Sequence, residues 1–345
     1  MPFRDVIGHR RLISVLARSA RAGTLPPSLI LGGPAGVGKR RVAVAVAQAL
    51  NCSSPRGPED VASHKEPVRL EIDACGACAT CQRIARGVHP DVVLVEPGDS
   101  GTIKVEQVRE VIDRAGYRPF EGRRRVVVID EADALVPAAQ NALLKTLEEP
   151  PSGSIFLLIT ARPDMLLATV RSRCPLLRFG PLSEDEVARA LLAAGKSETE
   201  ARAIAAVADG SMRRALDARA DDVLDARDVA ARVLMQVAVG ADPKRRLEAV
   251  KGLLEKTGAG GAGDREQLAV HLRAIAALLR DVAALTAGAG ATRVANPDLE
   301  ADLRRLQDFA GDRGVQAFAA VDQALEALAR NASTKIVADW IVLRL

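Results

Sequence analysis

Residues 32–40 read GGPAGVGKR, and this short stretch constrains the fold more than any other part of the chain. An apolar run, 28–31, precedes it, and an Ala- and Val-rich helical pattern follows it. The spacing GxxxxGK is that of a phosphate-binding loop, whose backbone N–H groups surround phosphates while the lysine reaches the terminal ones. A glycine turn that merely joins a strand to a helix is the alternative, and the order strand, loop, helix disfavours it. The predicted nucleotide-binding residues are Gly33, Gly36, Gly38, Lys39 and Arg40.

Arg40 stands where this type of loop normally carries a Ser or Thr whose hydroxyl coordinates Mg²⁺. A guanidinium about 4 Å from a divalent cation is repelled by roughly 8 kcal/mol at an effective dielectric constant of about 20. Swinging outward would relieve Arg40 of much of this repulsion, but the side chain would still offer no oxygen ligand. We therefore expect a site that is empty, or that binds ATP or ADP without efficient turnover, and in which Mg²⁺ binding is in doubt.

Acidic residues follow a further predicted strand. Residues 125–133 read RVVVIDEAD, an apolar run that ends on Asp130 and Glu131. At the carboxyl end of a strand beside a phosphate loop, Asp130 would hold Mg²⁺, and Glu131 would orient and deprotonate the attacking water. Two acids after a strand also occur at helix starts, but the earlier GxxxxGK favours the nucleotide site. Thr160, which ends the strand 155–160, is a candidate sensor of the γ-phosphate.

Four of the five cysteines lie between positions 52 and 81. Three of them are spaced by pairs of residues, and the fourth ends the preceding helix, so together they match a tetrahedral zinc site that would stabilise an insertion at about 52–81. An iron–sulfur centre lacks the expected further cysteine before a proline, and reduced, metal-free cysteines are the other alternative. His64 and His89 are interpreted as loop residues. The predicted zinc ligands are Cys52, Cys75, Cys78 and Cys81.

Strands and helices alternate through the first half of the chain. Alternation of this kind predicts an α/β fold with a parallel sheet covered on both faces and ligands at the carboxyl ends of its strands. Beyond Pro181 no strands are predicted, and the pairs Ser183 with Glu186 and Ser197 with Glu200 are capping boxes that start short helices. Longer amphipathic helices follow, with breaks at 258–264 and near Gly288. The strands are predicted at 28–31, 91–95, within 125–133, at 155–160 and at 176–179, and the helices at 8–22, 41–50, 106–115 and 138–149.

The bulk composition sets looser limits. The net charge of +4, with 27% charged residues, permits contact with nucleic acid but does not require it. No stretch approaches the roughly 20 apolar residues of a membrane span, and the N-terminus has no signal-like apolar region. A disulfide framework is disfavoured in a chain of this size that carries no secretion signal. We expect a soluble, cytoplasmic protein without membrane contact.

The sequence resembles the AAA+ subunits of the bacterial DNA polymerase III clamp loader. The resemblance rests on DEADALVPAAQNALLKTLEEPP at 130–151, RSRC at 171–174 and YRPFEGRRRVVVID just upstream of the acids. It covers nearly all of the first 220 residues, including the four-cysteine insertion, whereas the C-terminal helices match in general character. It implies a AAA+ P-loop domain at 1–180, a small helical lid at 181–222 and an all-α collar at 223–345.

Within this family, the chain resembles the delta-prime members more than the gamma/tau motor, because Arg40 replaces the loop hydroxyl, RSRC is intact and no tau-like extension follows the collar. The resemblance implies a stator in a hetero-oligomer with gamma/tau and delta subunits, which opens the sliding clamp and places it on primed DNA as part of a DNA polymerase (nucleotidyltransferase) holoenzyme. Arg173 would be an arginine finger for a neighbour's nucleotide, and Arg213 a sensor.

Many delta-prime chains have lost these acidic residues, whereas this chain retains Asp130 and Glu131 together with Lys39. Nucleotide binding therefore remains an open alternative. Glu131 is expected to be a vestigial or weak base, and the chain's own ATPase activity is expected to be absent or very weak. An active ATPase motor of gamma/tau type remains the alternative.

Overall fold

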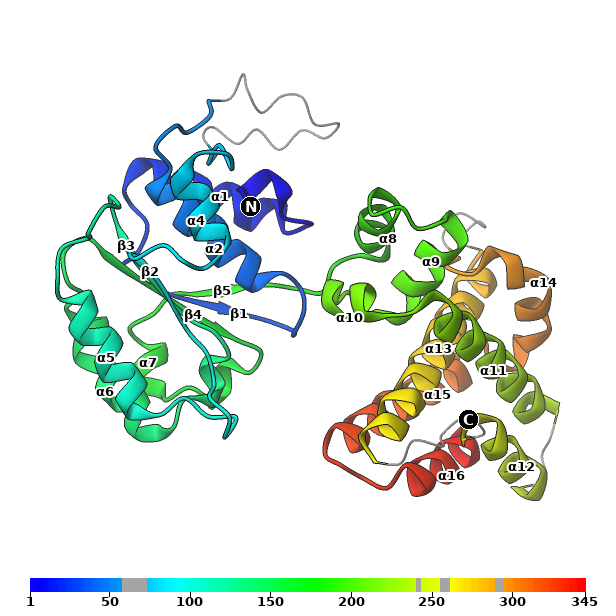
Figure 1. The fold of residues 1–345 in the computed structure, drawn as a ribbon. Helices are drawn as coiled ribbons and strands as arrows, with labels where there is room; N and C mark the ends of the chain where they lie inside the picture. The colour runs from blue at the N-terminus through cyan, green and yellow to red at the C-terminus, as the bar shows by residue number, and fades with distance from the viewer. Residues whose placement is uncertain (58–72, 240–242, 255–260, 289–293) are drawn as a thin grey trace. The chain divides into compact units, whose positions relative to one another are not determined.

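The computed structural model describes residues 1–57, 73–239, 243–254, 261–288 and 294–345, which form two compact units (Figure 1). The first unit comprises residues 1–182 and the second residues 183–345. His64 and most of the predicted loop at 53–70 lie outside the described residues. The finer division of the second unit into lid and collar remains a prediction.

The first unit is built on a five-stranded parallel sheet with the strand order β2-β3-β4-β1-β5. Every neighbouring pair of strands is parallel, so all five strands end at the same edge. The predicted α/β class is confirmed. The strands are β1 (Ser28–Gly32), β2 (Val92–Val95), β3 (Arg125–Ile129), β4 (Ser154–Thr160) and β5 (Leu176–Arg178).

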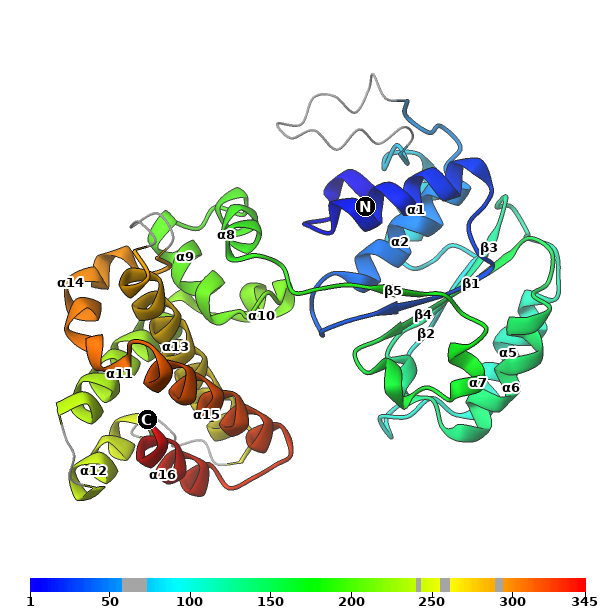
Figure 2. The same cartoon turned by 180° about the vertical axis from the view of Figure 1, so that it is seen from behind.

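Each face of this sheet is covered by its own helices (Figures 1 and 2). Successive strand residues point to opposite faces, so Leu29 and Leu31 enter one core, while Ile30 enters the other. Burial on both faces explains why the strands read as uninterrupted apolar runs. One face carries α1 (Arg10–Ala22) and α2 (Lys39–Asn51), and the other carries α5 (Val105–Ala115), α6 (Pro137–Glu148) and α7 (Ala168–Arg171). The remaining elements of this unit are η1 (Phe3–Asp5), α4 (Ala79–Ala85), η2 (Ala132–Ala134) and η3 (Pro163–Met165).

The described residues of the second unit form helices joined by turns and loops, with no strand among them. Both predicted capping boxes are present, with the side chains of Ser183 and Ser197 accepting from the backbone N–H groups of Glu186 and Glu200. The helices are α8 (Glu184–Ala193), α9 (Glu198–Val207), α10 (Met212–Asp217), α11 (Ala220–Val239), α12 (Pro243–Leu254), α13 (Ala262–Thr286), η5 (Pro297–Leu299), α14 (Glu300–Leu303), η6 (Arg304–Phe309), α15 (Asp312–Ala329) and α16 (Thr334–Arg344).

The break predicted at 258–264 is wrong for 262–264, while 258–260 lie outside the described residues. Helix α13 begins at Ala262 and packs against α11 and α15, so its first turn includes Gly263 and Asp264. A glycine costs a helix about 1 kcal/mol relative to alanine, which the packing of a long helix readily outweighs.

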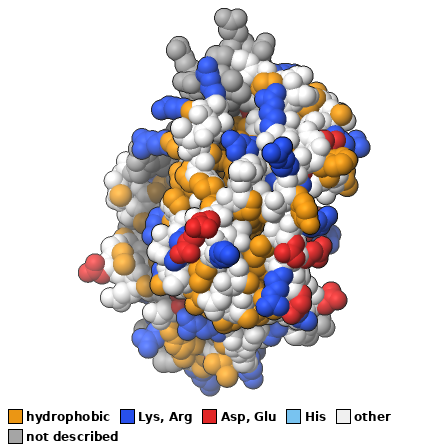
Figure 3. Space-filling model, turned by 90° about the vertical axis from the view of Figure 1, so that its left-hand side faces the viewer, with side chains coloured by type: hydrophobic (Ala, Val, Ile, Leu, Met, Phe, Trp, Pro, Cys, Tyr) orange, Lys and Arg blue, Asp and Glu red, His pale blue; other side chains and the backbone are white. Residues whose placement is uncertain are grey.

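The surface carries charges of both signs. On the face shown in Figure 3, Lys and Arg side chains are interspersed with acidic and apolar ones. None of the helices in the described ranges is both long and apolar enough to cross a lipid bilayer.

Asp91, directly before β2, fixes the loop that leads into β3. Its carboxylate accepts hydrogen bonds from the backbone N–H groups of Phe120, Glu121 and Gly122 at 2.7 to 2.9 Å, and from Arg125 Nη2 at 2.8 Å. Burial raises the pKa of Asp91, but these donors outweigh it and lower the pKa to about 2. A buried carboxylate therefore anchors the start of the strand that leads to Asp130.

We expect Asp91→Asn to lower the free energy of unfolding by about 3 kcal/mol at neutral pH, because it leaves the Arg125 charge buried and unpaired. The folded pKa of about 2 lies below the unfolded value, so the carboxylate's contribution is complete above about pH 4 and disappears as the pH falls towards 2. Urea denaturation at several pH values measures this. The exposed Glu110→Gln is the control, and a variant difference that does not shrink in acid would contradict the interpretation.

Candidate functional site

The candidate nucleotide site lies at the carboxyl edge of the sheet, where β1 passes into α2. Gly33, Gly36 and Gly38 have φ angles of 148°, 80° and 100°, a region that residues with a Cβ rarely adopt. A Cβ at Gly33 would lie 2.1 Å from the carbonyl oxygen of Phe179. At Gly38, the N-cap of α2, a Cβ would meet nothing within 4 Å. The glycines therefore fix the shape of the loop, and the space over Gly38 is open to a ligand.

Lys39 opens α2 and is only 6% exposed. Its Nζ donates hydrogen bonds to the carbonyl oxygens of Gly33 at 2.5 Å and Pro34 at 2.6 Å. Burial lowers the pKa of Lys39, and the charges of Asp130 and Asp133 oppose this in part. Within the described residues no carboxylate forms an ion pair with Nζ, so its charge remains available to an anion.

Arg40 joins the ends of two strands. Its Nη1 donates a hydrogen bond to Glu96 Oε1, directly after β2, and lies 3.4 Å from Asp130 Oδ2, directly after β3. Sequence reasoning missed Glu96, although its position after an apolar strand repeats the pattern that singled out Asp130. The guanidinium thus lies beside the carboxylate that was expected to hold a metal.

These residues do not fit the Mg²⁺ that the fold class implies. Mg²⁺ requires oxygen ligands in near-octahedral geometry at about 2.0–2.1 Å. The loop offers Arg40 in place of a hydroxyl, and the Asp130 carboxylate already pairs with that guanidinium. The sequence predicts that Arg40 repels a metal ion and offers it no oxygen, but it does not reveal that Arg40 also contacts Asp130, the second expected metal ligand.

Glu131 and Thr160 lie at the same edge of the sheet. Glu131 is exposed and adopts a left-handed conformation (φ 49°, ψ 49°) that costs free energy in a residue other than glycine. Thr160 Oγ1 donates to Asp133 Oδ1 at 2.9 Å and accepts from the Arg162 N–H at 2.9 Å, while Arg162 also pairs with Asp133. Asp133 and Arg162 were missed, although Asp133 belongs to the DEAD sequence. The proposed roles of Glu131 and Thr160 remain predictions.

Arg173 follows α7 and is partly exposed. Its side chain, 31% exposed, forms an ion pair with Glu148 at the end of α6, and its Nη1 donates to the Thr169 carbonyl oxygen at 2.9 Å. The neighbouring Cys174 is buried, and burial raises the pKa of its thiol to about 11, so this thiol is unreactive. Arg213 lies in α10 of the second unit with its side chain exposed. The roles proposed for both arginines remain predictions.

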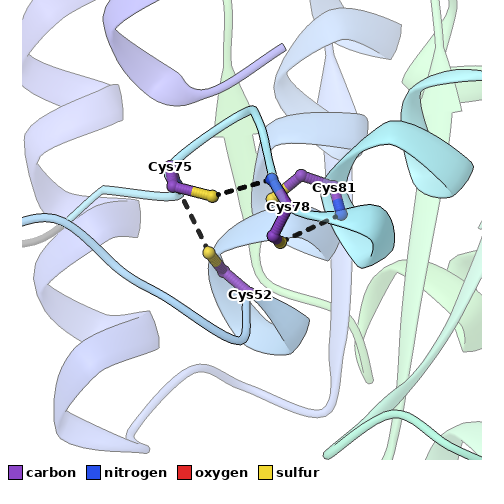
Figure 4. A group of neighbouring side chains, drawn as sticks. All are labelled: Cys52, Cys75, Cys78 and Cys81. Carbon is purple, nitrogen blue, oxygen red and sulfur yellow. Dashed lines mark hydrogen bonds between the residues drawn. The ribbon is translucent and has the colours of Figure 1, made fainter.

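The four predicted cysteine ligands come together in the first unit (Figure 4). All four Sγ atoms lie within 4.8 Å of one another, and three of the four residues are buried. Backbone N–H groups donate to three of the sulfurs: Cys75 to Cys52 at 3.3 Å, Cys78 to Cys75 at 3.2 Å and Cys81 to Cys78 at 3.4 Å. Burial raises the pKa of the Cys52 and Cys81 thiols, whereas at Cys78 burial is outweighed by hydrogen bonds from Ser53 and Cys81, which lower the pKa to about 5.

This arrangement fits a metal ion. A tetrahedral zinc site with Zn–S bonds of about 2.3 Å places its sulfurs roughly 3.8 Å apart, which falls within the observed limit of 4.8 Å between the Sγ atoms. N–H groups directed at the sulfurs stabilise thiolates, the form that binds metal. His89 accepts from the Asp91 N–H through Nδ1 at 3.1 Å, in keeping with its interpretation as a loop residue.

The N-terminal segment is bound to the loop that carries the cysteines. Asp73 accepts hydrogen bonds from the backbone N–H groups of Phe3 at 2.9 Å and Arg4 at 3.1 Å. The Arg4 guanidinium donates to the carbonyl oxygens of Ala74 at 2.8 Å and Cys75 at 2.9 Å. Sequence reasoning missed this contact, because no local pattern links positions so far apart.

A parallel sheet in this strand order, with a phosphate loop after β1 and acids after β3, defines a P-loop domain of the AAA+ class. Residues 8–183, just over half of the chain, match the family model described as "DNA polymerase III, delta subunit". The chain belongs to this family.

Individual relatives are gamma and tau subunits. The chain is 33% identical over 221 residues to DNA polymerase III subunit gamma of Buchnera aphidicola subsp. Acyrthosiphon pisum (strain APS), covering 62% of this chain and 57% of the relative. It is 34% identical over 220 residues to subunit tau of Escherichia coli (strain K12), covering 62% of this chain and 32% of the relative. The chain thus spans little more than half of the gamma subunit and a third of tau. A DNA polymerase III gamma subunit-related protein of Thermotoga maritima aligns with 95% of this chain and 97% of its own, at 18% identity and a TM-score of 0.39, too distant to bear on function.

We expect one Zn²⁺ per chain, held by the four clustered cysteines. Cys78→Ser should abolish binding and lower the free energy of unfolding by about 3 kcal/mol, the contribution of a ligand present at more than 100 times its Kd. Elemental mass spectrometry and thermal melting measure both effects. Cys174→Ala, outside the cluster, should retain the metal. Metal-free wild-type protein of undiminished stability would contradict this expectation.

Proposed function

We propose that this protein is a delta-prime-type stator of the DNA polymerase III clamp loader, which helps to load the sliding clamp onto primed DNA together with gamma/tau and delta subunits. The observation that carries this proposal is the pairing of Arg40 with Asp130 and Glu96. A subunit that turns over ATP needs a metal to bridge and neutralise the phosphates. Arg40 removes one ligand of that metal and engages another.

A second candidate is an active ATPase motor of gamma/tau type. Two observations favour it: the relatives at 33% and 34% identity are gamma and tau subunits, and Lys39, Asp130 and Glu131 are all present. This candidate needs another Mg²⁺ ligand in place of the loop hydroxyl and requires Arg40 to leave Asp130. The two candidates differ in ATP turnover by the purified chain.

In the stator, Arg173 acts on the nucleotide of a neighbouring subunit. Its ion pair with Glu148 lies at the surface, where the two side chains are 31% and 48% exposed. Pairs of this kind contribute at most about 1 kcal/mol. A phosphate group of a neighbour can therefore replace Glu148 at little cost, and the planar guanidinium suits such a ligand. The alternative is an ordinary surface ion pair.

We expect the purified protein to hydrolyse ATP negligibly. Arg40→Thr need not restore turnover, because an isolated AAA+ site also lacks a neighbour's arginine. Phosphate release in the presence of Mg²⁺ measures the rate, and Glu131→Gln distinguishes the protein's own activity from a contaminant. Steady wild-type turnover that Glu131→Gln abolishes would favour the motor instead.

We expect Arg173→Ala to leave folding and assembly intact but to reduce the DNA- and clamp-stimulated ATPase of the reconstituted complex, by about 10³-fold or more at the site that it serves. Arg173→Lys should rescue poorly, because lysine lacks the planar fork of donors. The exposed Arg171→Ala in the same segment is the matched control. A normally assembled Arg173→Ala complex that hydrolyses ATP and loads clamps at the wild-type rate would rule out the trans role.

A further inference from the structure

We propose that the phosphate loop binds a nucleoside diphosphate without a divalent metal, with the guanidinium of Arg40 taking the place of the metal beside Asp130 and Glu96. This inference rests on the proposed function, in which the subunit does not hydrolyse ATP. It adds which ligand this site binds, and that binding does not need a divalent metal.

The acidic side of the site already holds a cation that the protein itself supplies. Arg40 Nη1 contacts Glu96 and lies 3.4 Å from Asp130 Oδ2, so one cation, whose side chain is 48% exposed, serves two carboxylates that follow neighbouring strands. A divalent ion that reached Asp130 would have to displace the guanidinium and would then be repelled by it at short range. The two cations exclude each other from this position.

The phosphate side of the site does not depend on a metal. Three glycines fix the conformation of the loop. Nothing lies within 4 Å of the position that a Cβ of Gly38 would occupy, and the N-terminus of the 13-residue helix α2 begins directly after Gly38. Backbone N–H groups and the helix dipole favour an anion at such a terminus. Lys39 is buried, and its Nζ bonds two carbonyl oxygens but no carboxylate among the described residues. A phosphate would supply the anionic partner that the Lys39 ammonium does not have among the described residues.

The balance of charge favours a diphosphate. In P-loop sites the metal bridges the β- and γ-phosphate oxygens, so Mg²⁺-bound ATP brings a divalent ion towards Arg40. A diphosphate has no γ-phosphate, carries less negative charge and holds Mg²⁺ less tightly. It can therefore use Lys39 and the loop N–H groups while Arg40 stays on the acids.

Titration of the full-length protein with ADP and ATP, in EDTA and in Mg²⁺, tests this by isothermal calorimetry. We expect the Kd for ADP to change less than about twofold between the buffers, and ATP to bind about tenfold more weakly with Mg²⁺ than with EDTA. ADP binding that Mg²⁺ strengthens about tenfold or more would overturn the inference. So would the absence of ADP binding at millimolar concentration in both buffers.

Variants separate the two sides of the site. Arg40→Thr should make ATP bind about tenfold more tightly with Mg²⁺ than with EDTA, whereas Arg41→Thr, the matched control, should behave as wild type. Lys39→Ala should lose ADP in both buffers. If Arg40→Thr does not fold, as judged by circular dichroism, the wild-type titrations alone decide. Failure to bind ADP leaves the stator standing, while Mg²⁺-dependent turnover abolished by Glu131→Gln overturns the proposed function as well.

Discussion

The parallel pairing of all five strands brings the residues of the candidate nucleotide site to one edge of the sheet. Because the strands run in the same direction, Gly33 after β1, Glu96 after β2, Asp130 after β3 and Thr160 in β4 all lie where the strands end. Helices on both faces bury the residues of β1, β3 and β4, which are the inner strands of the sheet. The ion pair between α2 and the ends of β2 and β3 depends on this strand order.

The strand order also explains what could be predicted from the sequence. Apolar runs buried on two faces are unambiguous, so all five strands were predicted within a residue or two, and the glycine spacing identified the loop. The spacing of Cys75, Cys78 and Cys81 likewise brought these sulfurs together, with Cys52 returned by the end of α2. These predictions succeed because the sequence pattern and the strand, loop or cysteine cluster that it specifies lie within a few residues of each other.

Contacts between distant segments could not be predicted in this way. The pairing of Arg40 with Glu96 requires β2 to lie beside β3, and alternation of strands and helices does not set that order. Neither the Asp133–Arg162 pair nor the contact of Arg4 with Ala74 and Cys75 leaves a periodic trace in the sequence. Gly263 misled in the opposite sense, because the packing of α13 outweighs a weak local preference.

The link between the first residues and the cysteine loop has a consequence for the order in which the chain folds. Phe3 is buried in the same core as β1 and α2, but its backbone N–H donates to the carboxylate of Asp73, which lies 70 residues further along the chain. During synthesis the N-terminal segment therefore waits for that loop to emerge from the ribosome. Closing so long a loop costs conformational entropy, and metal binding by the adjacent cysteines would help to offset that cost. The partners of Phe3 and Arg4 are nevertheless synthesised before strands β3, β4 and β5.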